Sequence, residues 1–399
     1  MINKGSALRE GWEIRRLGDV YDVRDGTHDS PRYIEEGYPL ITSKNLKQDT
    51  LNYNKVKYIS HIDYVNINKR SKVDVGDILF AMIGTIGNPI VIKNEPDFAI
   101  KNVALFKVSD NQNSHFLKYF LDSEQVIKKM LRDAKGTTQK FVGLGYLRNF
   151  EIVLPPLQEQ EKIVAILDEA FLAIAKAKEN AELNLQNAKE LFESYLQGVF
   201  ENKGEGWEEK TLGELANVKS GGTPSRSKKE YWEGNIAWYS SGELNELFTV
   251  KPKRYINNLA IKNSTAKLFP QGSLLIGMYD TAALKMSIID RDATFNQAIA
   301  GVHPNKDIDL IFILNSINSI KPEILSLRRG VRQKNLNLTK IKNIPIFLPI
   351  IKTQQKIVKK LNTLQEQTKK LESIYTKKLQ DLEELKKSIL QKAFNGELT

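Results

Sequence analysis

The chain of 399 residues has 59 Lys and Arg against 48 Asp and Glu, a net charge of +11, and no cysteine. This length predicts two to three domains, and the lack of cysteine excludes disulfides, thiolate zinc sites and cysteine nucleophiles. The positive charge favours a polyanionic partner, and the absence of a long apolar run or an apolar N-terminal signal segment predicts a soluble cytoplasmic protein.

The first part of the chain, which opens with Gly11-Trp12-Glu13, has the mixed pattern of an α+β unit. Short apolar runs bounded by turn residues predict buried strands, and a later segment has helical periodicity. The strands are expected at Val56–Ile59, Ile78–Met82, Ile90–Ile92 and Ala104–Val108, and the helix at His115–Asp133.

Leu154–Phe200 predicts a long helix. Pro155 and Pro156 mark its start, where a missing N–H costs little, and the following segment of about 40 residues without proline corresponds to roughly 60 Å of helix. Apolar or small residues recur in steps of three and four, which predicts a coiled-coil seam. This seam is expected at Ile163, Leu167, Ala170, Ile174, Ala177, Ala181, Asn184, Ala188, Leu191 and Tyr195.

The second part of the chain repeats the first. Gly206-Trp207-Glu208 repeats the opening, Gly272–Met278 matches Gly76–Met82, and Asp309–Leu327 has the periodicity of the first predicted helix. Four single residues are matched between the halves: Asn102 with Asn296, Ala104 with Ala298, Gln139 with Gln333, and Lys140 with Lys334.

Leu348–Phe394 matches the first long helix without an insertion, and Asn395 with Gly396 predicts its end. Its seam is rich in Leu and Ile where the first is rich in Ala, so we infer that the two helices pack on each other within one chain. Two alternatives are that each helix packs only on its own domain, or that the seam dimerises a scaffold protein that binds RNA or protein. The second seam is expected at Ile357, Leu361, Leu364, Thr368, Leu371, Tyr375, Lys378, Leu382, Leu385 and Ile389.

Two polar loops stand at the same place in the two halves but differ in sequence, Arg24–Pro31 and Lys219–Arg226. Basic runs without an acid, Lys219–Lys229 and Arg328–Lys342, mix Lys and Arg with the hydroxyl and amide side chains that contact phosphates and base edges. One frame with two different surfaces suits the same task on two different targets. The alternative is an ordinary solvated surface of a lysine-rich chain.

Few residues suggest catalysis. The four histidines have no metal-binding spacing, so a metal site is not expected. The alternative function is a metal-dependent nuclease that acts alone and uses Asp97, Asp133 and Lys135, since two acids and a lysine can hold Mg²⁺ and activate water. His28 as a general base is a further alternative to a loop contact.

The order of the motifs resembles the DNA-specificity subunit of type I restriction-modification enzymes over essentially the full length. The resemblance rests on LPPLQEQEKIV at residue 154, the helix ends SYLQGVF and SILQKAFNGEL, and the loops DGTHDSP and SGGTPSRSKKEYW. It implies an α+β fold in which two mixed α/β target-recognition domains are joined by two long helices that form an intramolecular antiparallel coiled coil. The expected boundaries are 1–153 and 204–347 for the domains, and 154–203 and 348–399 for the helices.

The resemblance also implies a function without catalysis in this chain. Each domain would read one half of a bipartite, asymmetric DNA site, and the coiled coil would set the half-site spacing and dock two methyltransferase subunits. Restriction subunits would join that core. S-adenosylmethionine for adenine-N6 methylation, ATP and Mg²⁺ would belong to the partner subunits, and no cofactor would bind here.

The expected DNA-binding residues lie in the polar loops and basic runs, where unmatched residues would read bases and matched ones would serve phosphates or the framework. In the first domain they are Thr27, His28, Ser30, Arg32, Ser43, Lys44, Lys101, Asn102, Thr137, Thr138, Gln139 and Lys140. In the second they are Ser220, Thr223, Ser225, Arg226, Lys228, Lys229, Ser240, Tyr279, Asn296, Gln297, Arg329, Arg332, Gln333 and Lys334. The outward helix faces are expected to bind the methyltransferase through Glu159, Lys162, Gln354 and Lys356.

Overall fold

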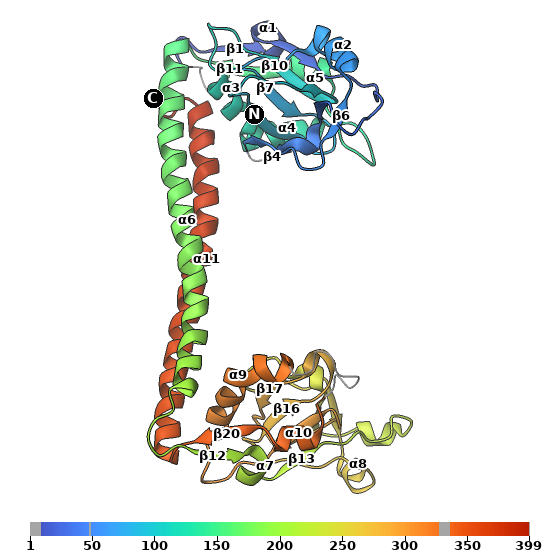
Figure 1. The fold of residues 1–399 in the computed structure, drawn as a ribbon, viewed down its shortest axis with the longest axis vertical. Helices are drawn as coiled ribbons and strands as arrows, with labels where there is room; N and C mark the ends of the chain where they lie inside the picture. Colours follow the sequence, from blue (N-terminus) through green and yellow to red (C-terminus); the bar gives the residue numbers. More distant parts are fainter. Residues whose placement is uncertain (1–8, 48, 327–335, 399) are drawn as a thin grey trace. The chain divides into compact units, whose positions relative to one another are not determined.

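The computed structural model describes residues 9–47, 49–326 and 336–398. The chain divides into two compact units (Figure 1). Unit 1 comprises Met1–Glu182 and Thr376–Thr399, and unit 2 comprises Leu183–Tyr375. Each unit therefore contains one globular body and one part of each long helix.

Unit 1 is built around a four-stranded antiparallel sheet of order β2-β10-β7-β8. A three-stranded sheet of order β6-β3-β9 and a two-stranded pair β1-β11 accompany it. Its strands are β1 (Glu13–Arg16), β2 (Asp22–Asp25), β3 (Tyr38–Ile41), β4 (Leu46–Lys47), β5 (Thr50–Leu51), β6 (Lys57–Ile59), β7 (Ile78–Ala81), β8 (Gly87–Val91), β9 (Ala99–Ile100), β10 (Val103–Lys107) and β11 (Glu151–Leu154). Its helices are α1 (Leu17–Val20), η1 (Ser43–Asn45), α2 (His61–Ser71), α3 (Ser114–Asp122), α4 (Glu124–Asp133) and α5 (Leu144–Asn149).

Unit 2 repeats this topology. Its four-stranded sheet has the order β13-β19-β16-β17, its three-stranded sheet the order β15-β14-β18, and its terminal pair is β12-β20. Its strands are β12 (Glu208–Thr211), β13 (Val218–Ser220), β14 (Ile236–Tyr239), β15 (Arg254–Ile256), β16 (Leu274–Gly277), β17 (Met286–Ile288), β18 (Ala293–Phe295), β19 (Ile299–Val302) and β20 (Pro345–Leu348). Its helices are α7 (Leu212–Leu215), η2 (Lys229–Trp232), η3 (Ser241–Glu243), α8 (Asn258–Lys262), η4 (Asp280–Ala282), α9 (Leu310–Ser326) and α10 (Leu338–Lys342). Both three-stranded sheets contain one parallel pair, β3-β9 and β14-β18.

The four-stranded sheet of unit 1 is buried on both faces. Phe80 and Phe106 belong to the core that includes α3, whereas their neighbours Leu79 and Leu105 belong to a second core with Ile41 of β3. Successive residues of a strand point to opposite faces, so the sheet separates the helical layer from the three-stranded sheet. This explains why these strands appear in the sequence as continuous apolar runs.

The predicted helix at His115–Asp133 is divided. It forms α3 and α4, which meet at Ser123, and the hydroxyl of Ser123 donates to the Phe120 carbonyl oxygen over 2.7 Å. Ser123 has an extended backbone, with ψ of 140°, which ends α3. The matching prediction in unit 2 is confirmed as one continuous helix, α9.

The long helices α6 (Leu157–Glu201) and α11 (Ile351–Phe394) pack on each other within each unit. In unit 1, Leu167 of α6 shares a core with Leu390 of α11, and Lys178 forms a 2.7 Å ion pair with Glu383. In unit 2, later α6 residues share a core with earlier α11 residues, among them Leu196 with Leu361. The helices are therefore antiparallel, as expected, and the prediction of an intramolecular coiled coil is confirmed.

Parts of the predicted seam are wrong. Leu191, Leu371 and Leu385 are 48%, 37% and 47% exposed, and Asn184 and Lys378 are exposed as well. At these turns the next residue is half-buried, Leu185, Phe192 and Leu379 after Asn184, Leu191 and Lys378, so the inward face lies one residue further along the helix.

The end of α11 lies where the sequence predicts it, after Phe394. Gly396 has a φ of +78°, a conformation that favours glycine, and the Glu397 amide donates to the Lys392 carbonyl oxygen over 2.9 Å. This left-handed glycine satisfies a carbonyl of the last helical turn.

Candidate nucleic-acid interface

In both units a polar loop leaves the four-stranded sheet at a glycine. The amide of Gly26, after β2, donates to the Val103 carbonyl oxygen over 3.0 Å, and the amide of Gly221, after β13, donates to that of Ile299 over 3.1 Å. A Cβ atom on Gly26 or Gly221 would lie 2.2 or 2.1 Å from a backbone oxygen. No side chain fits at these positions, so the glycines fix the departure point of each loop.

One side chain of each loop contacts the turn that precedes the neighbouring strand of the sheet, β10 in unit 1 and β19 in unit 2. In unit 1, Nδ1 of His28 lies 2.8 Å from Oδ1 of Asn102. In unit 2, the Thr223 hydroxyl donates to Oε1 of Gln297 over 2.6 Å. Both contacts join residues that were expected to bind DNA.

The backbone shows that these two contacts occupy matching positions. The Thr27 amide donates to the carbonyl oxygen of Ile100, the last residue of β9, and the Gly222 amide donates to that of Phe295, the last residue of β18. The Lys101 amide donates to the carbonyl oxygen of Ile41, the last residue of β3, and the Asn296 amide donates to that of Tyr239, the last residue of β14. Lys101 therefore corresponds to Asn296, and Asn102 corresponds to Gln297.

The sequence match of Asn102 with Asn296 and of Ala104 with Ala298 is thus wrong. Ala104 pairs with Phe80 and Asp25, and the residue with equivalent partners is Ala300, which pairs with Ile276 and Ser220. Unit 2 has one more residue between β18 and β19 than unit 1 has between β9 and β10. This insertion in a polar turn shifts the register.

Six of the expected residues of unit 1 come together around the His28 contact. Asp25, which is buried, lies 2.9 Å from Nε2 of His28 and also forms an ion pair with Arg70 of α2. Lys101 donates to the Ser30 hydroxyl, and the Ser43 hydroxyl donates to the Asn102 carbonyl oxygen over 3.2 Å. A cavity of about 330 Å³ beside them is lined by Thr27, Asp29, Ser30, Pro31, Asp63, Asn66, Ile67, Arg70 and Ser71.

The other expected residues of unit 1 are exposed. Arg32 lies on the same loop as His28, and Lys44 lies in η1. Thr137, Thr138, Gln139 and Lys140 form a separate turn, which Lys135 and Phe141 close by exchanging backbone hydrogen bonds of 3.0 and 2.9 Å.

In unit 2, five expected residues line one polar cavity of about 460 Å³. They are Thr223, Arg226, Ser240, Asn296 and Gln297. The Ser240 hydroxyl donates to Glu243 over 2.7 Å as part of the cap of η3, so it already serves the local fold. Sequence reasoning missed Pro224, Trp238, Glu243, Lys253 and Arg254, which complete the lining.

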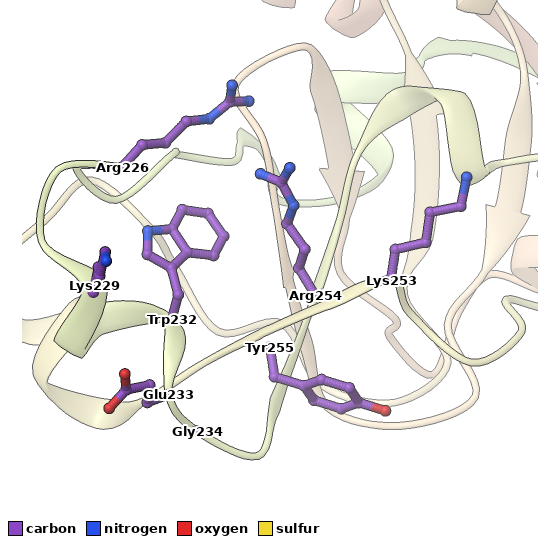
Figure 2. A pocket seen from close by; sticks show the side chains of 8 residues that line it. All are labelled: Arg226, Lys229, Trp232, Glu233, Gly234, Lys253, Arg254 and Tyr255. Carbon is purple, nitrogen blue, oxygen red and sulfur yellow. The ribbon is translucent and has the colours of Figure 1, made fainter.

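A second cavity of unit 2 has a volume of about 700 Å³ (Figure 2). It is lined by Arg226, Lys229, Trp232, Glu233, Gly234, Lys253, Arg254 and Tyr255. Only Arg226 and Lys229 were expected here. The basic run Lys251, Lys253 and Arg254 contains no acid, and this signal would have pointed to the missed cations.

The remaining expected residues of unit 2 are dispersed. Ser220 ends β13, and the Ser225 hydroxyl contacts that of Ser227 at 2.8 Å. Lys228 donates to the Tyr231 hydroxyl over 3.1 Å, and Tyr279 packs half-buried against the core. Arg329, Arg332, Gln333 and Lys334 lie outside the described residues.

Two of the four residues expected on outward helix faces point inward. Gln354 has no exposed surface, and its side chain donates to the Pro349 carbonyl oxygen and accepts from the Asp309 amide, both over 2.8 Å. Glu159 is half-buried and binds Trp12 over 2.9 Å and Arg9 over 3.0 Å. Both serve helix starts that dock on their own unit, whereas Lys162 and Lys356 are exposed.

The nuclease alternative is not supported. The Asp133 carboxylate is occupied by Lys129 and Tyr146, at 2.8 and 2.9 Å, and Lys135 closes the exposed turn with Phe141. Asp97 lies in the loop between β8 and β9. Within the described ranges no three His, Asp or Glu side chains are grouped so that they could hold a metal ion.

The fold and its surface define a class of protein, one with two topologically equivalent α+β units that carry different polar side chains on the same loop frame. The described helices include none that is long and apolar enough to cross a membrane. A model of the type I restriction modification DNA specificity domain matches the chain twice, over residues 9–185 and 204–384. The chain therefore belongs to the family of type I restriction-modification DNA specificity domains.

Individual relatives agree with this family. The type I restriction enzyme MjaVIII specificity subunit of Methanocaldococcus jannaschii is 24% identical over 99% of this chain and 94% of its own. The EcoR124I/EcoR124II specificity subunit of Escherichia coli is 32% identical over 51% of each chain. The crystal structure of the HsdS subunit from Thermoanaerobacter tengcongensis covers both chains fully, with a TM-score of 0.66 at 19% identity, which shows a shared fold.

Proposed function

We propose that the chain is the sequence-specific DNA-binding subunit of a type I restriction-modification system, and that each α+β unit reads one half of a bipartite, asymmetric site. The observation that carries this proposal is the matched pair of contacts, His28 with Asn102 and Thr223 with Gln297. Equivalent backbone positions hold different donors and acceptors, which is what two unlike half-sites require.

In this proposal the recognition domains span residues 1–153 and 204–347. The helices, residues 154–203 and 348–399, set the half-site spacing and dock two methyltransferase subunits, which restriction subunits join. Lys162 and Lys356 are exposed near the repeated helix starts, so they are the two residues that we propose for docking.

The division of chemistry follows from this assignment. Methylation and cleavage belong to the partner subunits, which bind S-adenosylmethionine, ATP and Mg²⁺, and this chain works in the cytoplasm without a cofactor. The loop side chains of each unit contact base edges, and exposed lysines and arginines beside them contact phosphates.

A domain exchange tests the proposal. Replacing residues 1–150 with the equivalent segment of a relative, in cells that supply the methyltransferase subunits, should change one half of the methylated sequence and leave the other half unchanged. The matched control replaces residues 204–347 and should change only the other half. An unchanged sequence in both exchanges would contradict the assignment.

A further inference from the structure

A cation lies over an aromatic ring at the same place in both units. Lys57 opens β6 and its Nζ lies 4.1 Å from the centroid of the Tyr33 ring. Arg254 opens β15 and its Cζ lies 5.7 Å from the Trp232 ring. Lys57 pairs with Leu40 of β3, and Arg254 pairs with Trp238 at the equivalent position of β14, so the two cations occupy matching positions.

In unit 2 this pair belongs to the larger cavity, of about 700 Å³. Arg226, Lys229, Lys253 and Arg254 are all exposed there, against the single carboxylate of Glu233. Within the described part of the chain, none of the four cations forms an ion pair with an acid. By contrast, Arg291 and Lys210 of the same unit do, with Asp290 and Glu208. The cavity lining therefore has a net positive charge.

The backbone around this cavity is held in place while the charged groups remain available. The Trp232 indole donates to the Ser225 carbonyl oxygen over 3.1 Å and packs edge-on against Trp238, with ring centroids 5.1 Å apart. The Lys253 amide donates to Glu243 over 3.0 Å. Figure 2 shows the Arg226 side chain passing above the Trp232 ring and the Arg254 side chain to the right of that ring. The cations are thus presented by a preorganised frame, which lowers the entropic cost of binding.

The chemistry of the lining distinguishes this cavity from its neighbour. The smaller cavity presents amide and hydroxyl groups from Asn296, Gln297 and Thr223, which suit base edges. The larger cavity lacks these amides and the threonine hydroxyl, so its donors are mainly the cations of Arg and Lys, which suit phosphate oxygens. Arg226, Lys253 and Arg254 line both cavities, so the two adjoin.

We propose that the larger cavity is a DNA-backbone subsite of unit 2, which holds a phosphodiester beside the bases that the polar cavity contacts. In unit 1 the counterpart of Arg254 and Trp232 is Lys57 over the Tyr33 ring. This inference rests on the proposed function, and it assigns Arg254 and Arg226 to affinity and positioning rather than to sequence.

The test compares Arg254→Ala with Lys306→Ala, which removes the same charge from an exposed residue of unit 2 that lines neither cavity. The full chain is titrated, between about 50 and 200 mM salt, with a duplex that carries its methylated sequence and with a scrambled duplex. Arg254→Ala should weaken both complexes by the same factor. It should also make the negative slope of log K against log salt shallower by about one. Arg226→Ala, from the loop after β13, should do the same, and Lys306→Ala should leave the slope unchanged.

Three results would overturn the proposal, and each has a different meaning. If the unaltered chain binds neither duplex, the proposed function fails together with the subsite. If the unaltered chain binds but the slopes of Arg254→Ala and Arg226→Ala are unchanged, only the subsite fails. If these variants lose only the specific complex, or Trp232→Ala changes the methylated sequence, the cavity contacts a base rather than a phosphate.

Discussion

Nδ1 of His28 lies 2.8 Å from Oδ1 of Asn102, and unit 2 replaces this pair with Thr223 and Gln297, joined at 2.6 Å. Each pair holds a loop side chain against the turn before β10 or β19, so its polar atoms are fixed by the fold before DNA binds. The imidazole and amide of one unit and the hydroxyl and longer amide of the other present different donors and acceptors. If these four side chains contact bases, as the proposed function requires, the two units should prefer different sequences.

The first prediction concerns Gln297. Gln297→Ala removes the amide that can pair with a base edge, and it should reduce discrimination at one base pair by about 1–3 kcal/mol. The effect should appear only in the half-site that unit 2 reads, and it is measured by sequencing methylated positions in cells that contain the methyltransferase subunits. Asn102→Ala should affect only the other half.

A control for this experiment is Gln271→Ala, which removes an exposed amide of unit 2 that lines neither cavity. It should leave the methylated sequence unchanged. Relaxation of both half-sites by Gln297→Ala would show that the units do not read DNA independently.

The second prediction concerns the buried glutamines at the starts of α6 and α11. Gln354 bonds to Pro349 and to the Asp309 amide, and Asp309 in turn caps α9 through bonds to Ile311 and Phe312. Gln354→Ala leaves these buried groups unpaired and should lower the free energy of unfolding by about 1–3 kcal/mol. Urea titration followed by circular dichroism measures the loss.

Gln160 is the equivalent residue of α6, and it makes one such bond, to Pro155 over 2.8 Å. Its Oε1 has no partner among the described residues. Gln160→Ala should therefore cost less than Gln354→Ala. The exposed neighbours provide matched controls, because Gln158→Ala and Gln355→Ala should change stability little. Equal losses of stability from all four variants would contradict a structural role of the two buried glutamines.

The architecture was predictable because its main signals are local. A proline-free apolar repeat defines each long helix, and the two copies of it reveal the duplication. The inward position of Gln354 also has a local signal, although its polar side chain suggests an exposed position. Gln354, Val358 and Leu361 follow steps of four and three, and residues with this spacing share one face of a helix. All three are buried.

The polar loops were less predictable because their geometry depends on pairing between distant segments. One additional residue in the turn after β18 changes which side chain faces Thr223, and such an insertion between polar residues has no signature in one sequence. The larger cavity of unit 2 needs Arg226, Trp232 and Arg254, which come together only when β15 pairs with β14. Charge patterning locates the cations but not their convergence.

The third prediction tests the position of the coiled-coil seam with identical substitutions. Leu196 and Leu390 are 3% and 4% exposed, whereas Leu191 and Leu385, five residues earlier on the same helices, are 48% and 47% exposed. Leu196→Ala and Leu390→Ala should each cost about 2–5 kcal/mol, because they leave cavities in packed cores. Leu191→Ala and Leu385→Ala should cost less than about 1 kcal/mol. Urea unfolding of the four variants ranks their stabilities. Equal losses from Leu196→Ala and Leu191→Ala, or from Leu390→Ala and Leu385→Ala, would contradict the observed buried face of the helices.

The last prediction concerns His303, whose ring stacks on Phe269 with centroids 4.4 Å apart. Burial, and secondarily the charge of Lys219, lower the pKa of His303 below its usual 6.5. As the pH falls below 6.5, the unfolded chain therefore takes up this proton before the folded chain does. The contribution of His303 to stability is complete above pH 6.5 and is lost as the pH falls through its folded-state pKa.

His303→Phe tests this dependence, because it keeps an aromatic ring over Phe269 and removes the titrating group. The free energy of unfolding is measured in urea from about pH 7.5 to about pH 5 for both chains. Below pH 6.5 the free energy of unfolding should fall more steeply for the unaltered chain than for His303→Phe, since only the unaltered chain loses stability by protonating His303. Lys219→Met, which removes a cause of the lowered pKa, should reduce that difference. Parallel curves for the unaltered chain and His303→Phe would show that His303 does not titrate differently in the folded state.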